Sequence, residues 1–215
     1  MERPKVNPAP PVLSRRRLPL DPTAMARSLI GKLLVRATPE GRMSGRIVEV
    51  EAYLENDAAA HSFRGETNRN RSMFLRRGHA YVYFIYGTWF ALNVSGGAAG
   101  VGAAVLIRAL EPVEGLDLMR VRRPHAADHR LASGPGCLAT AFGIDFRFDG
   151  LDLCAPGALW LAPGPVRTGV ASVGVSVRIG ISKEAHRPLR FFERGNPCLS
   201  GPRYLSGPAG RVRRT

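Results

Sequence analysis

The chain has 215 residues and carries 31 lysines and arginines against 17 aspartates and glutamates, which gives a formal net charge of +14. This length favours one domain, and a hydrophobic content of 45% is ordinary for a chain that buries a core. The positive charge favours a polyanionic partner, and nucleic acid outranks a membrane because no run of about 18 apolar residues and no signal-peptide core is present. We expect an intracellular protein, cytoplasmic and nucleoid-associated or otherwise with access to DNA.

The cysteines and histidines give no support to a metal or redox site. Cys137, Cys154 and Cys198 are far apart and match no Cys-x-x-Cys spacing, which predicts reduced thiols. His125 and His129 stand four residues apart, but no acidic or cysteine partner completes a ligand set. The chain also lacks a P-loop and a Gly-x-Gly-x-x-Gly after a strand. No metal and no cofactor is expected.

The N-terminal residues predict an arm followed by one domain. Residues 1–17 combine several prolines with three consecutive arginines, a composition that buries little apolar surface. We expect a basic, disordered arm over 1–17, a single domain over 18–205 and a basic tail over 206–215. Asp21 and Pro22 offer an N-cap and a first-turn proline, which predicts a helix that ends at Gly31 before a strand begins.

The run from Arg46 to Tyr53 predicts a strand with two distinct faces, because its residues alternate with a period of two. The apolar face holds Val48, Val50, Ala52 and Leu54. The other face holds Ile47, Glu49, Glu51 and Tyr53. A carboxylate that projects beside an aromatic ring indicates a site.

The loop after this strand is basic. Its arginines include Arg64, Arg69, Arg71 and Arg76, interleaved with asparagines and aromatic residues. A charge run is usually a solvated face, but this mixture is also what grips a phosphate backbone. Given the net charge, we favour phosphate contact.

A β-hairpin is predicted by the aromatic run Tyr81–Gly87 and the following Phe90–Val94, because the break at Gly87 separates two strand-like segments. Tyr86 would lie at the tip of this hairpin. The position marks it as a candidate for contact with a partner, whereas Tyr81 fits better as a core residue.

The second half of the chain predicts one more central strand, two helices and closing strands. Residues 103–110 form a short apolar run whose single charge, Arg108, must be paired or face a cleft. Residues 111–120 have helical spacing after a proline, and Ser133-Gly-Pro-Gly136 opens a helix whose free N–H groups could receive a phosphate. Residues 170–181 and 188–192 resemble strands. The fold class is α+β: a single domain with a curved, mostly antiparallel mixed sheet, flanked by helices and carrying a protruding hairpin.

Several of these motifs together resemble the alkyladenine (3-methyladenine) DNA glycosylase family, from about Asp21 to Gly195. The matching motifs are Glu51-Ala-Tyr53, His61-Ser, Asn68-Arg-Asn-Arg71, Met73-Phe, Tyr81-Val-Tyr83, Ile85-Tyr-Gly87, Asn93 and Leu110-Glu-Pro-Val-Glu-Gly115. The resemblance implies base-excision repair: a monofunctional hydrolase flips an alkylated or deaminated purine out of double-stranded DNA, cleaves its N-glycosidic bond and leaves an abasic site. A monomer is expected.

The resemblance also assigns roles to residues. Glu51 would activate water, in preference to Glu49 on the same face, and Arg108 would orient the carboxylate or a phosphate. Tyr53 and His61 on one side and Tyr83 on the other would hold the base, and Asn93 would crowd the 2-amino group of guanine. Tyr86 would be the wedge in the minor groove. The DNA backbone would contact Arg64, Arg69, Arg71, Arg76, Gly134 and Gly136.

Two other functions stay open at this point. A non-catalytic, basic nucleic-acid-binding module would explain the charge, although an intact Glu51 argues against it. A glycosylase of the helix-hairpin-helix class would explain the segment from Ser133 to Phe142, but the first helix of that motif and its downstream aspartate are missing.

Overall fold

The computed structural model describes residues 8–85, 87–165 and 172–207, and this part of the chain holds three α-helices and eight strands. The helices are α1 (Pro22–Leu29), α2 (Leu116–Arg122) and α3 (Pro135–Phe142). The strands are β1 (Leu33–Thr38), β2 (Gly41–Tyr53), β3 (Ala80–Ile85), β4 (Trp89–Ser95), β5 (Ala104–Glu114), β6 (Leu159–Ala162), β7 (Val173–Ser176) and β8 (Arg190–Glu193). Short 3₁₀ turns lie at Arg15–Arg17, Arg71–Phe74, Asp128–Arg130, Phe146–Phe148 and Arg203–Leu205.

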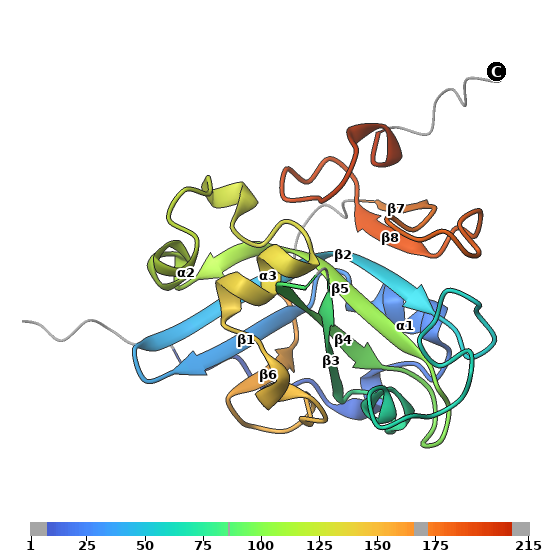
Figure 1. Ribbon diagram of the computed structural model, residues 1–215. Coiled ribbons are helices and arrows are strands. Elements are labelled where there is room, and N and C mark those ends of the chain that lie inside the picture. Colours follow the sequence, from blue (N-terminus) through green and yellow to red (C-terminus); the bar gives the residue numbers. More distant parts are fainter. Residues whose placement is uncertain (1–7, 86, 166–171, 208–215) are drawn as a thin grey trace, which may run out of the picture.

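One curved sheet holds all the described strands, in the order β3-β4-β5-β2-β1-β6, with β7 and β8 branching from β2 (Figure 1). Every pairing among these strands is antiparallel. Long β2 is the organising strand, because β5 pairs with one edge while β1 and then β8 pair with the other. The predicted α+β class is confirmed, and within the described residues the sheet is antiparallel rather than mixed.

A β-bulge changes the faces that the alternation in β2 predicted. Ile47 lies opposite Leu110 and Glu49 lies opposite Ala109, so Val48 is an extra residue in β2. Ile47 therefore joins the main core, which Val50 and Ala52 also line, while Val48 packs elsewhere. The predicted assignment was wrong for Ile47 and Val48 because simple alternation has no place for an extra residue. The predicted faces are correct for Val50 and Ala52, which lie beyond the bulge.

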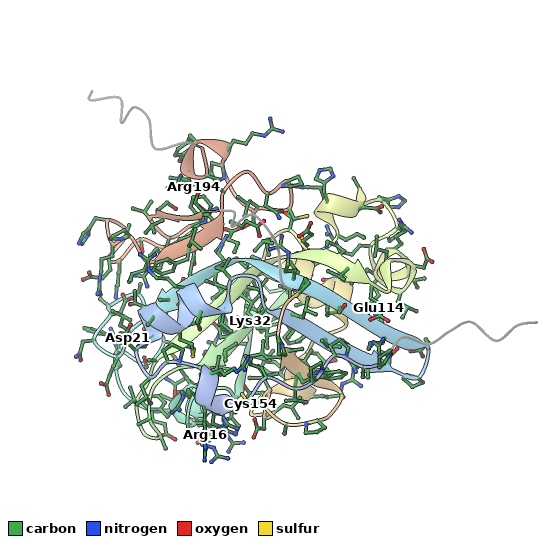
Figure 2. All side chains as sticks on the ribbon, turned by 180° about the vertical axis from the view of Figure 1, so that it is seen from behind. Arg16, Asp21, Lys32, Glu114, Cys154 and Arg194 are labelled. Atoms are coloured by element: carbon green, nitrogen blue, oxygen red, sulfur yellow. The ribbon has the colours of Figure 1, made fainter. Side chains whose placement is uncertain are left out.

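The helices cover the sheet from two sides. In Figure 1, α3 lies in front of the sheet and α1 behind it. Figure 2, from the opposite side, has α1 in front. The start of α1 follows the prediction, because the carboxylate of Asp21 accepts a hydrogen bond from the N–H of Ala24 and Pro22 is the first helical residue. Figure 2 labels Asp21 at this end of the helix. Within the described residues, no helix is long and apolar enough to cross a lipid bilayer.

The helix predicted over residues 111–120 begins later than expected. β5 continues to Glu114, and α2 begins at Leu116 after Gly115 turns the chain with a φ of 73°. The extra strand length is stabilised by β2, since Arg42 pairs with Glu114 and Arg46 pairs with Glu111 across the two strands. Cross-strand pairing thus outweighs the local helical spacing.

The described part of the predicted disordered arm is ordered. The side chain of Leu13 is fully buried, and its N–H donates to the carbonyl of Leu161 in β6. Arg15 forms an ion pair with Asp152 and also donates to the carbonyl of Arg77. The expectation of disorder is therefore wrong for residues 8–17, because contacts with distant residues offset the polar local composition. Residues 1–7 lie outside the described residues.

The C-terminal strands are shorter than predicted. The run over 170–181 forms only β7, at Val173–Ser176, and β8 begins at Arg190. The chain leaves the sheet after Ser176 because Arg178 forms a fully buried ion pair with Asp57. Residues 170 and 171, and the part of the predicted tail from residue 208 onward, lie outside the described residues.

The predicted hairpin is formed by β3 and β4. Tyr83 faces Ala91, and Ile85 faces Trp89, so residues 86–88 connect the strands. Tyr86, the predicted wedge, lies outside the described residues.

Leu13→Ala tests the packing of the N-terminal segment. Deleting a fully buried leucine side chain leaves a cavity, so we expect the free energy of unfolding in urea to fall by about 2–5 kcal/mol. Arg16→Ala is the matched control, because Arg16 is exposed in the same segment, and its effect should stay within about 0.5 kcal/mol. Equal, small effects of both changes would mean that this segment does not contribute to folding.

Candidate active site

A cavity of about 400 Å³ lies where the hairpin, β5, the 59–73 loop and the start of α3 meet. Five of the residues predicted for the site line it, together with a basic residue predicted for the DNA backbone. They are Tyr53, His61, Tyr83, Asn93, Arg108 and Arg69. The volume is in the range of cavities that hold small organic ligands.

The aromatic residues of the cavity are arranged differently from the prediction in one respect. His61 packs edge-to-face on Tyr83, with ring centroids 4.4 Å apart, and Tyr83 stacks on Tyr81 at 5.4 Å. The Nδ1 atom of His61 lies 2.8 Å from the hydroxyl of Tyr81. His61 therefore groups with Tyr83, and the expectation that it shares a side with Tyr53 is wrong. The reason is that the 57–70 loop folds over β3.

The surroundings of His61 disfavour its charged form. Desolvation lowers its pKa below the ordinary value of 6.5, and the nearby charge of Arg69 lowers it further. The His61 ring packs against Tyr83 and places Nδ1 at the Tyr81 hydroxyl. Its neighbour Asn93 is buried and donates from Nδ2 to the carbonyl of Tyr81 at 3.1 Å, which fixes the amide against β3.

Tyr53 is held in place by a buried ion pair. The guanidinium of Arg178 lies 4.6 Å from the centre of the Tyr53 ring, and Arg178 is itself paired with Asp57. Burial raises the pKa of the Tyr53 hydroxyl, so this group keeps its proton. The hydroxyl donates a hydrogen bond of 3.0 Å to Oε2 of Glu51.

Glu51 lies directly behind the cavity wall and has no exposed surface. Its Oε1 accepts from the N–H of Ile179 at 2.8 Å and forms an ion pair with Arg108 at 3.2 Å. Tyr53, Arg108 and Ile179 all line the cavity. Burial raises the pKa of Glu51, although Arg108 and the two hydrogen bonds oppose that shift.

Glu49, the competing carboxylate, is occupied on all sides. Its Oε1 accepts from Nε of Arg190 at 2.7 Å, from Nε of Arg108 at 3.1 Å and from the Ser200 hydroxyl at 2.9 Å. Its Oε2 accepts from the N–H of Ser200 at 2.5 Å. Four donors match the approximately four acceptor positions of a carboxylate. Glu49 is therefore a structural anion, whereas Glu51 has three such partners.

Arg108 joins the two carboxylates because of a second irregularity in the sheet. Glu49 faces Ala109 and Val50 faces Ile107, so Arg108 is an extra residue in β5. Its Nε contacts Glu49 and its Nη1 contacts Glu51. The single charge in the apolar run is thus paired, as the cost of burying a lone cation requires.

The residues predicted to contact the DNA backbone lie apart from these carboxylates. Arg64, Arg71 and Arg76 are exposed, and Arg69 lines the cavity. Gly134 precedes α3 with a φ of 111°. A Cβ atom on Gly136 would lie 3.1 Å from Cβ of Trp89, so close packing of α3 on β4 also explains that glycine.

Two buried pairs that shape the site were not predicted. Asp57 and Arg178 are 121 positions apart, and Glu49 and Arg190 are 141 apart, so no local pattern connects them. The available signal was weak: Arg178 stands alone in the apolar run 170–181, as Arg108 does in 103–110. A lone charge in an apolar run indicates a buried partner without naming it.

The chain is similar to known proteins over most of its length. The sequence pattern of the family described as methylpurine-DNA glycosylase (MPG) matches residues 17–197. A Mesorhizobium japonicum protein named as a 3-methyladenine DNA glycosylase is 56% identical over 195 residues, which cover 91% of this chain and 93% of that protein. A Paraburkholderia phytofirmans protein of the same name is 53% identical over 193 residues, with 90% of each chain covered. Human DNA-3-methyladenine glycosylase is 44% identical over 191 residues, which cover 82% of this chain and 63% of the human protein. The resemblance seen in the sequence is confirmed, and the chain belongs to the methylpurine-DNA glycosylase family.

Proposed function

We propose that this protein is a base-excision repair enzyme that hydrolyses the N-glycosidic bond of alkylated or deaminated purines in DNA. Membership of the methylpurine-DNA glycosylase family supports the activity, and the cavity supports the substrate class. The enzyme acts as a monomer on double-stranded DNA that contains a damaged purine, and it works where it has access to DNA. The net charge of +14 supports a polyanionic substrate.

The cavity receives the flipped purine between aromatic walls. Tyr53 forms one wall, and Tyr83 with His61 forms the other. An alkylated purine is electron-poor and stacks on such rings for the same reason that cations do. Asn93, fixed by its hydrogen bond to Tyr81, restricts the edge of the base. An enzyme that takes a base out of the stack must also fill the gap, and we assign that task to Tyr86 in the hairpin connection.

Glu51 activates the water that attacks the sugar. The observation that carries this assignment is the contrast between the two buried carboxylates: Glu49 has four donors, while Glu51 has three and keeps an acceptor position on Oε2. A water that donates to this position gains nucleophilic character, and the carboxylate also stabilises an oxocarbenium-like sugar. Arg108 is the positioning residue, because it holds Glu51 through Oε1.

The function is tested with a duplex that contains one 1,N6-ethenoadenine or one hypoxanthine. We expect abasic sites, detected as strand breaks after alkali, on the damaged duplex and none on the undamaged control. Tight binding without abasic sites on either lesion would favour the alternative of a non-catalytic binding module.

Glu51→Gln should abolish excision, because the amide keeps the shape of the side chain but cannot accept a proton. We expect a loss of at least about 100-fold in the single-turnover rate, which is the low end for a general base, with unchanged affinity for the lesion duplex. Glu55→Gln is the matched control, since Glu55 is exposed two residues beyond Tyr53. Near wild-type excision by Glu51→Gln would show that another group activates the water.

The pH dependence of excision should report the raised pKa of Glu51. Only the ionised carboxylate acts as a base, so the rate falls as the pH falls through that pKa. Because burial raises it, the acidic limb of the profile should lie above the ordinary glutamate value of 4.5. The measurement is the single-turnover rate between pH 4 and 9, with folding checked by circular dichroism. A rate that stays constant down to pH 4.5 would contradict a desolvated base.

The enzyme should be monofunctional and stop at an intact abasic site. A glycosylase that also cuts the strand normally attacks the sugar with an amine. Of the 31 basic residues only Lys5, Lys32 and Lys183 are lysines, and none lies in the segment from Arg46 to Arg108 that supplies most of the cavity. Arginine is too basic for this role.

Borohydride added during turnover should therefore trap no covalent protein–DNA adduct, and strand breaks should appear only after alkali. An adduct that forms with the wild-type enzyme and disappears in Lys183→Ala would overturn direct hydrolysis by water. Lys32→Ala serves as the matched lysine control.

A further inference from the structure

A second cavity of about 300 Å³ lies beside the hairpin, and the proposed reaction does not use it. Its walls come from β1, the end of the hairpin, the end of α2 and the C-terminal half of α3. Three arginines from distant parts of the sequence line it: Arg36, Arg122 and Arg147. Such a convergence of guanidinium groups is a site for an anion with several oxygen atoms.

The guanidinium groups are close enough to influence one another. The pKa of Arg36 is lowered, chiefly by burial and then by the charges of Arg122 and Arg147. Nε of Arg36 is buried and has no hydrogen-bond partner among the described residues. The same guanidinium donates from Nη1 to the carbonyls of Ala37 and Ala158 and lies over the ring of Phe148, so Arg36 is held in place at the cavity wall.

The acidic groups nearby leave the cavity with an excess of positive charge. Asp145 lines it and is paired with Arg147, and Glu40 lies close enough to raise the pKa of Arg36. Against three cations these carboxylates leave a net positive charge. The guanidinium of Arg147 stays accessible, because 80% of its side chain is exposed.

The rim of the cavity is aromatic. Trp89 is 43% exposed and Phe146 is 55% exposed, and Phe90 packs edge-to-face on Phe146 at 5.0 Å. Arginines beside exposed aromatic rings suit a ligand with an anionic group attached to an apolar body. A nucleotide backbone, with phosphates between deoxyriboses, has this character.

The two cavities are lined by different parts of the hairpin and of α3. Phe84 and Ile85 of the hairpin line the first cavity, whereas Thr88, Trp89 and Phe90 line the second. α3 connects the two, since Pro135 lines the first and Gly143 the second. Eight residues of helix span about 12 Å, which corresponds to about three or four base pairs at 3.4 Å each. A hairpin that enters the minor groove has one strand on each side.

We propose that the cavity lined by Arg36, Arg122 and Arg147 binds a backbone phosphate of the strand opposite the lesion. This inference rests on the proposed DNA glycosylase function. The first cavity takes the damaged nucleotide from one strand, and the arginines hold the other strand on the far side of the hairpin. The complementary strand is thus fixed while its partner base is turned out.

The test combines arginine variants with neutral phosphates. The ligand is a duplex with a tetrahydrofuran abasic-site analogue, which the enzyme cannot hydrolyse, and single methylphosphonates replace the phosphates of each strand in turn. Wild-type protein should lose about tenfold in affinity at one or two positions of the opposite strand. In Arg122→Gln the same substitutions should cost less affinity than in the wild type, because one of the three arginine contacts is already missing.

Arg147→Gln is the second variant, since its exposed side chain can be changed without disturbing the fold. Arg120→Gln is the matched control: Arg120 lies on α2 with Arg122 but pairs with Asp117 and Asp128 outside the cavity. We expect Arg122→Gln and Arg147→Gln to reduce the slope of log affinity against log salt by about one each, and Arg120→Gln to leave it unchanged. Thermal unfolding confirms that all three variants fold.

The inference is overturned if Arg122→Gln and Arg147→Gln bind like Arg120→Gln, or if the sensitive phosphates lie on the lesion strand. Excision by the wild-type enzyme is measured separately on a hypoxanthine duplex. If abasic sites form but no methylphosphonate on the opposite strand weakens binding, only the phosphate site is refuted. If a methylphosphonate on the opposite strand weakens binding but no abasic sites form, only the proposed catalysis is refuted.

Discussion

Two carboxylates, Glu49 and Glu51, lie two residues apart on a buried strand, and the structure around the site depends on their neutralisation. Neither has exposed surface, and an uncompensated buried charge costs about 3–5 kcal/mol when one partner is removed. The fold supplies two cations from different strands: Arg108 from β5 and Arg190 from β8. Arg190 reaches Glu49 because β8, and no longer β1, pairs with this part of β2. The same pairing brings the C-terminal residues, including Ser200, against the sheet. The irregularity in β5 thus places Arg108 at both carboxylates, and the branching of the sheet brings Arg190 to Glu49.

The two carboxylates differ in what remains available to a substrate. Glu49 is saturated by donors and fixes Arg108, and Arg108 in turn holds only one oxygen of Glu51. Glu51 therefore combines a fixed position with an acceptor site near the cavity. A second buried ion pair, Asp57 with Arg178, holds Tyr53 in a similar way. Arg178 lies over the Tyr53 ring, and the Tyr53 hydroxyl donates to Glu51. Glu51 and Tyr53 are thus each held by a buried arginine, Arg108 and Arg178 respectively.

The sequence allowed prediction of those features that local patterns determine. The capping of α1, the strand that carries Glu51 and the presence of the β3–β4 hairpin all follow from patterns over a few residues. Other features depend on contacts with distant strands and were not predicted. They are the faces of Ile47 and Val48, the order in residues 8–17 and the extension of β5 to Glu114. The site divides in the same way: motif residues such as Tyr53 and Asn93 were found, while the partners that hold them were missed. Glu49 and Arg190 illustrate the reason, since their contact exists only after two strands pair.

The chain's preference for arginine over lysine connects the buried network with the basic surface. A guanidinium presents several donors in a fixed plane, so Arg108 contacts two carboxylates at once and Arg190 contacts Glu49, two hydroxyls and two carbonyls. The same geometry suits the oxygen atoms of a phosphate, which our proposals assign to the exposed arginines of the 57–77 loop and to the three arginines of the second cavity. Arginine also keeps its charge when it is buried, which a desolvated lysine does not. A basic protein built on arginine can therefore bind the phosphates of DNA without relying on nucleophilic amines, and in our proposal water is the nucleophile.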